Sequence, residues 1–310
     1  MTASNEAPAV RVTPKVRVVR LRRPGRIVGI ALVLLVSALI LATLITNPRF
    51  QWDVVFGYLF NDRIMRGLAM TLMLTVVAMA IGLVLGVLLA VMRVSDSWVL
   101  NRSAGFYLWF FRGTPVLVQL VFWYNLGYLF PTLDLGVPFL EPLYSLPTND
   151  VVTPLTAAIL GLGLNEAAYL AEIIRAGIIS IPQGQHEAAT SIGMTRRQAM
   201  RRVVLPQAMR VIVPPTGNET IGMLKTTSMV SVIALSDLMY SAQSIYSRTF
   251  EVIPLLITVS IWYLALTSVL SYGQSHIERY FGRGEQGHRP RSGRPRAAAS
   301  QAQELGDLGR

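Results

Sequence analysis

The segment PQGQHEAATSIGMTRRQAMRRVVLP, residues Pro182–Pro206, is a polar and basic stretch that lies between two long apolar runs. The composition of His186–Ile192 favours a short helix. Gly193 follows at the position where glycine commonly ends a helix in a left-handed conformation. We therefore predict a short helix that stops in a turn at Gly193.

A second short helix is predicted just after that turn. Thr195 and Gln198 have the spacing of a capping box, in which each side chain binds the backbone of the other residue. Leu205–Pro206 is expected to close this helix, because proline has no amide hydrogen to donate. The two helices and their turn, residues 183–206, are called the elbow below.

The composition places the chain among membrane proteins. Of its 310 residues, 52% are hydrophobic and 15% are charged, and the mean hydropathy is +0.47. Soluble domains carry about 25% charged residues, so we predict a polytopic protein with one membrane domain. Cysteine is absent, which excludes disulfides, thiol nucleophiles and cysteine metal sites.

Six apolar segments are long enough to cross a membrane as helices, which takes about 20 residues each. The fold class predicted from them is an all-α membrane protein with a cytoplasmic elbow. The first segment is interpreted as an anchor, because it is long for a signal peptide and no small-residue cleavage site follows it. The predicted spans are Ile27–Thr46, Gly67–Met92, Phe106–Phe130, Thr153–Ala176, Val211–Leu235 and Ile253–Leu270.

Basic residues predict which ends of the spans face the cytoplasm. The segment before Ile27 carries seven Lys or Arg residues and the elbow carries four Arg, whereas the loop Pro131–Val152 has neither type. Only the loop Asn47–Arg66, expected outside, departs from the pattern with three arginines. We therefore expect a basic cytoplasmic tail over residues 1–26 and a disordered cytoplasmic tail over residues 282–310, rich in Gly, Pro and Arg.

A stripe of small residues marks one face of the second span. Ala78, Gly82, Gly86 and Ala90 recur every four residues, and small residues allow another helix to approach closely. We predict a packing face there, within the bundle or against another chain. The alternative is chance, since Gly and Ala are common in membrane helices.

The residues needed for several kinds of chemistry are absent. The chain has two lysines, Lys15 and Lys225, and neither follows a glycine-rich phosphate loop. The three histidines show no metal-ligand spacing, and no Gly-x-Ser-x-Gly motif occurs. We therefore predict no enzymatic activity, no metal site and no bound cofactor; any ATP must bind to another chain.

A DNA-binding helix-turn-helix is an alternative interpretation of the elbow. That module normally sits within a soluble core that includes a third helix. Here the elbow is bounded by apolar segments, Ile173–Ile179 before it and Val211 after it. This context argues against nucleic acid as a partner.

The elbow resembles the EAA loop of ABC importer permeases. The family pattern is Glu-Ala-Ala, three residues, Gly, nine residues, Ile, one residue and Leu-Pro. Glu187-Ala188-Ala189, Gly193 and Leu205-Pro206 match it, and Val203 stands in the place of isoleucine. The preceding Gln183-Gly184-Gln185 resembles the residues that precede this motif in the polar amino acid uptake subfamily.

Three further motifs resemble the same family, in family order, over residues 64–275, which we take as the permease transmembrane domain. Arg112-Gly113-Thr114-Pro115 is similar to its Arg-Gly-Thr-Pro. Ala168-Tyr169 with Glu172 and Arg175 resembles Ala-Tyr-x-x-Glu-x-x-Arg-Gly, with Ala176 in place of the glycine. Residues 225–229, KTTSM, resemble Lys-Asp-Thr-Ser-Leu with two substitutions.

The resemblance implies the permease subunit of an ATP-driven importer for polar amino acids or close analogues, in a prokaryotic plasma membrane. Such permeases pair with a second copy or a sister permease, and an extracytoplasmic solute-binding protein delivers the substrate. Each EAA loop docks on a cytosolic ATPase subunit, which binds Mg-ATP. The family core has five spans, so residues 27–46 look like an additional helix of open role. The residues implied in coupling are Gln185, Glu187, Ala188, Ala189, Gly193, Leu205 and Pro206.

Polar residues inside the predicted spans are candidates for the substrate path. A charge at bilayer depth costs at least ~2.5 kcal/mol, so such groups usually face a cavity or a partner. Glu166 is suited to bind a substrate ammonium group and Lys225 a carboxylate. The alternative is a structural Glu166–Lys225 ion pair. The candidate path residues are Asn165, Glu166, Tyr169, Asn218 and Lys225.

Two further groups are expected to be structural or to form a gate. Glu172 and Arg175 are three residues apart on one helix face, which favours an ion pair. Arg112-Gly113-Thr114-Pro115 interrupts a span, and irregular backbone at membrane depth must line protein or water. A kink is one interpretation of this motif and a gate is the other.

A stand-alone secondary transporter or channel is the alternative function from another class. It would have no use for a docking elbow, and such transporters often show inverted repeats, which we do not find. The sequence leaves open which amino acid is carried and whether the permease pairs with itself.

Overall fold

The computed structural model describes residues 24–135 and 144–281. The tails predicted over residues 1–26 and 282–310 lie almost entirely outside these residues. The chain divides into two compact units, the first ending at Gln51 and the second beginning at Trp52. The first unit contains α1 (Pro24–Thr46) and a 3₁₀ turn (Pro48–Phe50). No charged residue occurs over Ile27–Thr46, as expected of a helix surrounded by lipid.

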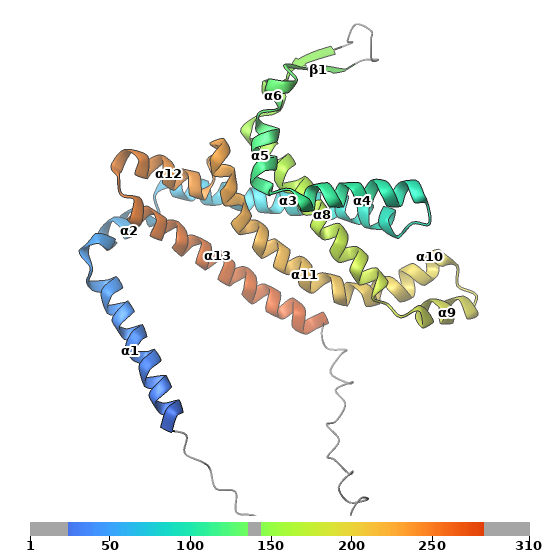
Figure 1. Ribbon diagram of the computed structural model, residues 1–310, viewed down its shortest axis with the longest axis horizontal. Helices are drawn as coiled ribbons and strands as arrows, with labels where there is room; N and C mark the ends of the chain where they lie inside the picture. The colour runs from blue at the N-terminus through green and yellow to red at the C-terminus, as the bar shows by residue number, and fades with distance from the viewer. Residues whose placement is uncertain (1–23, 136–143, 282–310) are drawn as a thin grey trace, which may run out of the picture. The chain divides into compact units, whose positions relative to one another are not determined.

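The second unit is built from long helices that pack lengthwise, with shorter helices at both ends (Figure 1). Its elements in chain order are α2 (Trp52–Leu59), α3 (Asp62–Val94), α4 (Trp98–Gly113), α5 (Val116–Tyr124), α6 (Leu126–Leu129), β1 (Thr132–Leu135), β2 (Tyr144–Pro147), α7 (Thr148–Val151), α8 (Pro154–Ile179), α9 (Gln183–Ser191), α10 (Arg196–Ala199), a π-helical turn (Met200–Val204), α11 (Leu205–Thr226), a 3₁₀ helix (Thr227–Ile233), α12 (Leu238–Thr249) and α13 (Val252–Phe281).

The predicted spans correspond to four unbroken helices and two bent pairs of helices. Val28–Thr46 of α1, α3, α8 and α13 are each long and apolar enough to cross a membrane. The third predicted span is not one helix, because α4 and α5 meet at 99°. The fifth continues as a 3₁₀ helix and turns by 44° into α12. Counting each bent pair as one span gives the predicted six.

The loop predicted over Pro131–Val152 contains structure that the sequence analysis did not predict. Strands β1 and β2 pair antiparallel, with Thr132 opposite Pro147 and Leu135 opposite Tyr144. Thr148 at the start of α7 is buried, and its amide donates to the carbonyl oxygen of Pro131 at 3.0 Å. This contact joins the two ends of the loop.

The predicted small-residue stripe is a helix-packing face, and its neighbour is α8. Ala78, Gly82, Gly86 and Ala90 are all buried. A Cβ atom added at Gly82 would lie 2.7 Å from Cγ of Glu166, and one at Gly86 would lie 3.0 Å from Cβ of Leu170. The two glycines therefore allow the close approach of α3 and α8.

Gly82→Leu is expected to lower the free energy of unfolding by about 1–3 kcal/mol, because the added side chain forces the two helices apart. Gly222→Leu is the matched control, since no atom lies within 4 Å of a Cβ built at Gly222 of α11. Thermal unfolding of the purified chain in detergent measures both. Equal transition temperatures in the two variants would contradict close packing at Gly82.

Candidate functional site

The turn of the elbow has the hydrogen bonds of a Schellman motif. Gly193 has a φ of +78°, the left-handed region that favours glycine. Its amide donates to the carbonyl oxygen of Thr190 at 2.9 Å, and the Met194 amide donates to that of Ala189 at 3.1 Å. These two bonds complete the end of α9, so the cap predicted at Gly193 is confirmed.

The start of the second elbow helix is confirmed as well. The Thr195 hydroxyl accepts from the Gln198 amide at 3.3 Å, and the Gln198 side chain accepts from the Thr195 amide at 2.9 Å. This reciprocal pair is the predicted capping box. The elbow is therefore fixed by backbone hydrogen bonds on both sides of its turn.

The predicted end of the second helix at Leu205–Pro206 is wrong. The chain stays helical from α10 through the π turn Met200–Val204 into α11, and the Leu205 amide donates to the carbonyl oxygen of Met200. The wider turn carries one extra residue, which accommodates a proline that would disturb regular α-helix. The elbow is thus continuous with a membrane helix.

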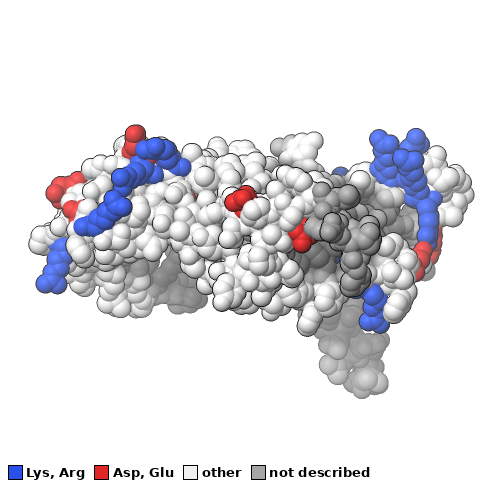
Figure 2. All heavy atoms as spheres, turned by 90° about the horizontal axis from the view of Figure 1, so that it is seen from above, with Lys and Arg blue, Asp and Glu red and all other residues white. Residues whose placement is uncertain are grey.

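The elbow divides its residues between an inner and an outer face. Ala189 is 3% exposed and packs inward, whereas Gln185, Glu187 and Ala188 are exposed. Leu205 and Pro206 are exposed at the start of α11. Figure 2 shows Lys and Arg at both ends of the view, one of which carries α10, with few charges over the middle. The outer face is available to a partner.

The break between α4 and α5 has a defined set of hydrogen bonds. Pro115 has no amide hydrogen to donate to the carbonyl oxygen of Phe111, four residues earlier. The side-chain amides of Gln119 and Asn165 donate to that oxygen instead, at 3.0 and 2.9 Å. Gln119 also donates to the Thr114 hydroxyl at 2.7 Å. A buried polar network therefore replaces the missing helix bond.

This network gives the Asn165 side chain two partners within the bundle, Phe111 and Gln119, and its predicted place on the substrate path stays a prediction. Gln119 is not among the site residues predicted from the sequence. The signal was present, because Gln119 is the sole amide in the apolar helix Val116–Tyr124, and polar residues at such depth have specific partners.

The Glu166–Lys225 ion pair is not formed. Within residues 24–135 and 144–281, ion pairs join Arg175 to Glu172 and Arg196 to Asp96. Glu166 is 3% exposed and packs against Gly82, and its Oε1 is buried without a hydrogen-bond partner. Lys225, in contrast, is exposed. The predicted pair of Glu172 and Arg175 is confirmed, with Nε donating at 3.0 Å.

Arg112 and Tyr169 lie together beside several carboxylates. The guanidinium carbon of Arg112 is 5.5 Å from the centre of the Tyr169 ring, close enough for a cation–π contact. Arg112 interacts electrostatically with Glu172 and Glu219, and Glu166 interacts with Glu219. This polar cluster joins α4, α8 and α11. Asn218 lies apart from it, with its Oδ1 accepting from Gln274 of α13 at 2.9 Å.

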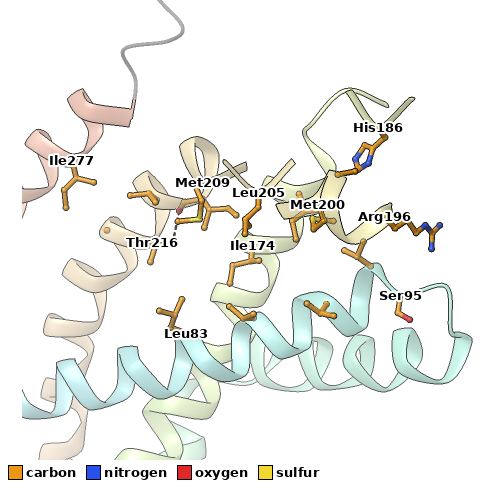
Figure 3. A pocket seen from close by; sticks show the side chains of 18 of the residues that line it. Leu83, Ser95, Ile174, His186, Arg196, Met200, Leu205, Met209, Thr216 and Ile277 are labelled. Carbon is orange, nitrogen blue, oxygen red and sulfur yellow. Dashed lines mark hydrogen bonds between the residues drawn. The ribbon is translucent and has the colours of Figure 1, made fainter. Parts of the chain in front are cut away.

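A groove of about 1150 Å³ lies beside the elbow. Figure 3 shows side chains of α3, α8 and α11 pointing into it, including Leu83, Ile174 and Met209. None of the predicted substrate-path residues lines it, and among the elbow residues predicted for coupling only Leu205 does. Over the described ranges, no three His, Asp or Glu side chains come together as a metal site would require.

Comparisons with known proteins identify relatives over most of the chain. The family model "Binding-protein-dependent transport system inner membrane component" matches residues 82–282. The arginine transport system permease protein ArgU of Corynebacterium glutamicum is 46% identical over 265 residues, covering 85% of this chain and 82% of the relative. The glutamine transport system permease protein GlnP of Escherichia coli K12 is 32% identical over 234 residues, covering 74% and 97%.

A solved structure agrees with these sequence relatives. The crystal structure of an amino acid ABC transporter with histidines superposes with a TM-score of 0.62 at 38% identity, covering 71% of this chain and 95% of that one. Inward-facing MetNI methionine ABC transporter, at 23% identity and a TM-score of 0.55, shares the fold.

Proposed function

This chain belongs to the family of binding-protein-dependent transport system inner membrane components, and from that premise we propose that it is the permease of an ABC importer for cationic amino acids. The observation that carries the proposal is the elbow, a rigidly capped pair of helices whose outer face is exposed and whose second helix runs on into a membrane span. The family does not hydrolyse ATP itself, so the energy must enter through a partner.

The elbow supplies the point where an ATPase subunit can act. Glu187 and Ala188 lie on the outer face of α9, and the Schellman turn at Gly193 fixes α9 against the next helix. Because α10, the π turn and α11 form one helical run, a force on the elbow moves α11. We place the elbow and both chain termini in the cytoplasm, in line with the positive-inside rule.

The polar cluster favours a substrate with a positive charge. Glu166 and Glu219 interact electrostatically inside the bundle, and Glu166 has a buried oxygen without a partner. Two carboxylates that share a site repel each other, and a cation between them relieves the repulsion. The Arg112–Tyr169 pair beside them is suited to the substrate carboxylate. The relative ArgU is named for arginine transport, which agrees with this assignment.

We propose that the path runs between two permease copies, past the exposed side chains of Tyr169, Lys225 and Arg112. A solute-binding protein then supplies the amino acid from outside. Residues 27–46 form a helix additional to the transport domain over residues 64–275.

Uptake into vesicles tests the function. The complete complex, reconstituted with its ATPase and binding protein, is expected to accumulate radiolabelled arginine only when ATP is supplied to the ATPase side. Unlabelled lysine should compete at least about tenfold better than unlabelled glutamine, in keeping with the value of a charge-assisted hydrogen bond. ATP-independent uptake would instead indicate a stand-alone transporter, and stronger competition by glutamine would refute the cationic substrate class.

A further inference from the structure

The groove beside the elbow is a wedge between two pairs of helices. At one end of the bundle α3 packs against α12 and α13 through Ile64, Leu68, Leu238 and Leu255. At the other end the groove opens between α3 and α8 on one side and α11 and α13 on the other (Figure 3). The wedge therefore lies in the half of the membrane spans that adjoins the elbow.

The inner part of the groove is chemically suited to hydrocarbon. The donors of its polar side chains are already used, because the Thr216 hydroxyl donates to the carbonyl oxygen of Ile212 at 2.8 Å and the Thr220 hydroxyl donates to that of Thr216 at 3.0 Å. The Gln274 amide nitrogen donates to Asn218. A polar solute would find no free donor on these side chains. The apolar lining includes Leu83, Val87, Ile174, Met209, Val213 and Ile277.

The mouth of the groove is basic. Arg196 and His186 line it, and Figure 3 shows both at the end away from Ile277. Arg196 pairs with Asp96 at 3.0 Å, but both side chains are more than 80% exposed, at 94% and 84%, and such a pair contributes little. Arg197, Arg201 and Arg202 are exposed on the same helical run, and none forms an ion pair within the described part of the chain.

We propose that this groove binds an anionic phospholipid of the adjoining leaflet, with an acyl chain in the wedge and the phosphate at Arg196. An apolar wedge that begins inside the membrane and opens at its surface matches the two ends of a phospholipid. Arg196 at the mouth complements an anionic headgroup, and basic residues between membrane helices bind such headgroups. The lipid would hold α3 and α11 apart on the side of the bundle next to the elbow.

Site-specific fluorescence quenching tests the lipid site. Because this chain has no cysteine, Val91→Cys gives it a single thiol. The purified permease is labelled there with a small fluorophore before the full complex is assembled and reconstituted in nanodiscs. Brominated phosphatidylglycerol and brominated phosphatidylcholine are then compared as quenchers. The label is expected to reach half-quenching at an about fivefold lower mole fraction of the anionic lipid, the preference that one basic residue at a membrane surface provides.

The chain offers matched controls for both ends of the lipid. Leu88 lies on the same helix with similar exposure, 56% against 59% for Val91, and does not line the groove; a label there should show no headgroup preference. Arg196→Gln should remove the preference at position 91, whereas Arg102→Gln, which removes an exposed arginine of α4 outside the groove, should keep it. A label at position 91 that neither lipid quenches would show that protein, such as a second copy, fills the groove. Quenching there without headgroup preference would equally overturn the proposal.

Discussion

Gly193→Val is expected to lower the affinity of the permease for its ATPase subunit by about 100-fold and to abolish ATP-driven uptake. A β-branched residue in a left-handed conformation costs of order 1–3 kcal/mol, and the two Schellman bonds at Thr190 and Ala189 depend on that conformation. The strain is relieved by unwinding the end of α9, which displaces Glu187 and Ala188 from the docking face. Pull-down of the ATPase from the inserted permease measures the affinity.

Gly193→Asn is the control for this prediction. Asparagine adds a side chain about as large as valine but tolerates the left-handed region, and nothing lies within 4 Å of a Cβ built at Gly193. ATPase binding should therefore be largely kept. If asparagine abolishes binding as completely as valine, the partner contacts Gly193 directly. Unchanged binding by the valine variant would refute the elbow as the docking site.

Glu166→Gln is expected to reduce uptake of arginine by about 100-fold while the complex remains assembled. The substitution keeps the size of the side chain beside Gly82 but removes the carboxyl group that would bind the substrate cation, and a hydrogen bond to a charged group contributes about 1.5–3 kcal/mol. Initial uptake rates in vesicles, compared at equal amounts of assembled complex, provide the measurement.

Glu172→Gln distinguishes a substrate carboxylate from a structural one. Glu172 lies on the same helix as Glu166, but its carboxylate forms an ion pair with Arg175. A partly exposed pair of this kind contributes about 0–1 kcal/mol to stability. Its uptake should fall less than about fivefold. Transport at the wild-type rate in Glu166→Gln would remove Glu166 from the substrate path and leave it a packing role against α3.

The local features of the elbow were predictable from the sequence, whereas the partners of its neighbours were not. Gly193, Thr195 and Gln198 act through backbone atoms within a few residues, so their spacing alone predicts the turn and the capping box. The stripe at Gly82 and Gly86 likewise predicts close packing. Which helix packs against that face depends on the tertiary arrangement of the helices, and a pattern within one helix does not determine it.

Long-range contacts account for what the sequence does not predict. The sequence predicts the depth of Asn165 and Lys225 in apolar segments, but depth does not fix direction around a helix axis. Asn165 faces the break at Phe111 across 54 residues of sequence, whereas Lys225 is exposed and forms no ion pair with Glu166. The prediction that the second helix ends at Leu205–Pro206 is wrong because it assumes a regular α-helix before the proline. The π turn that precedes Leu205 has a different hydrogen-bonding pattern, so the chain stays helical through Pro206.

The π turn also sets the rotational phase between the elbow and the membrane helix that follows. One residue of α-helix corresponds to about 100° of rotation, so the extra residue within Met200–Val204 determines which side of α11 points in the same direction as Arg196. Removing one residue there would leave both helices intact and turn every later side chain of α11 about a quarter of the way round. A signal from the elbow would then reach the bundle through a different set of neighbours.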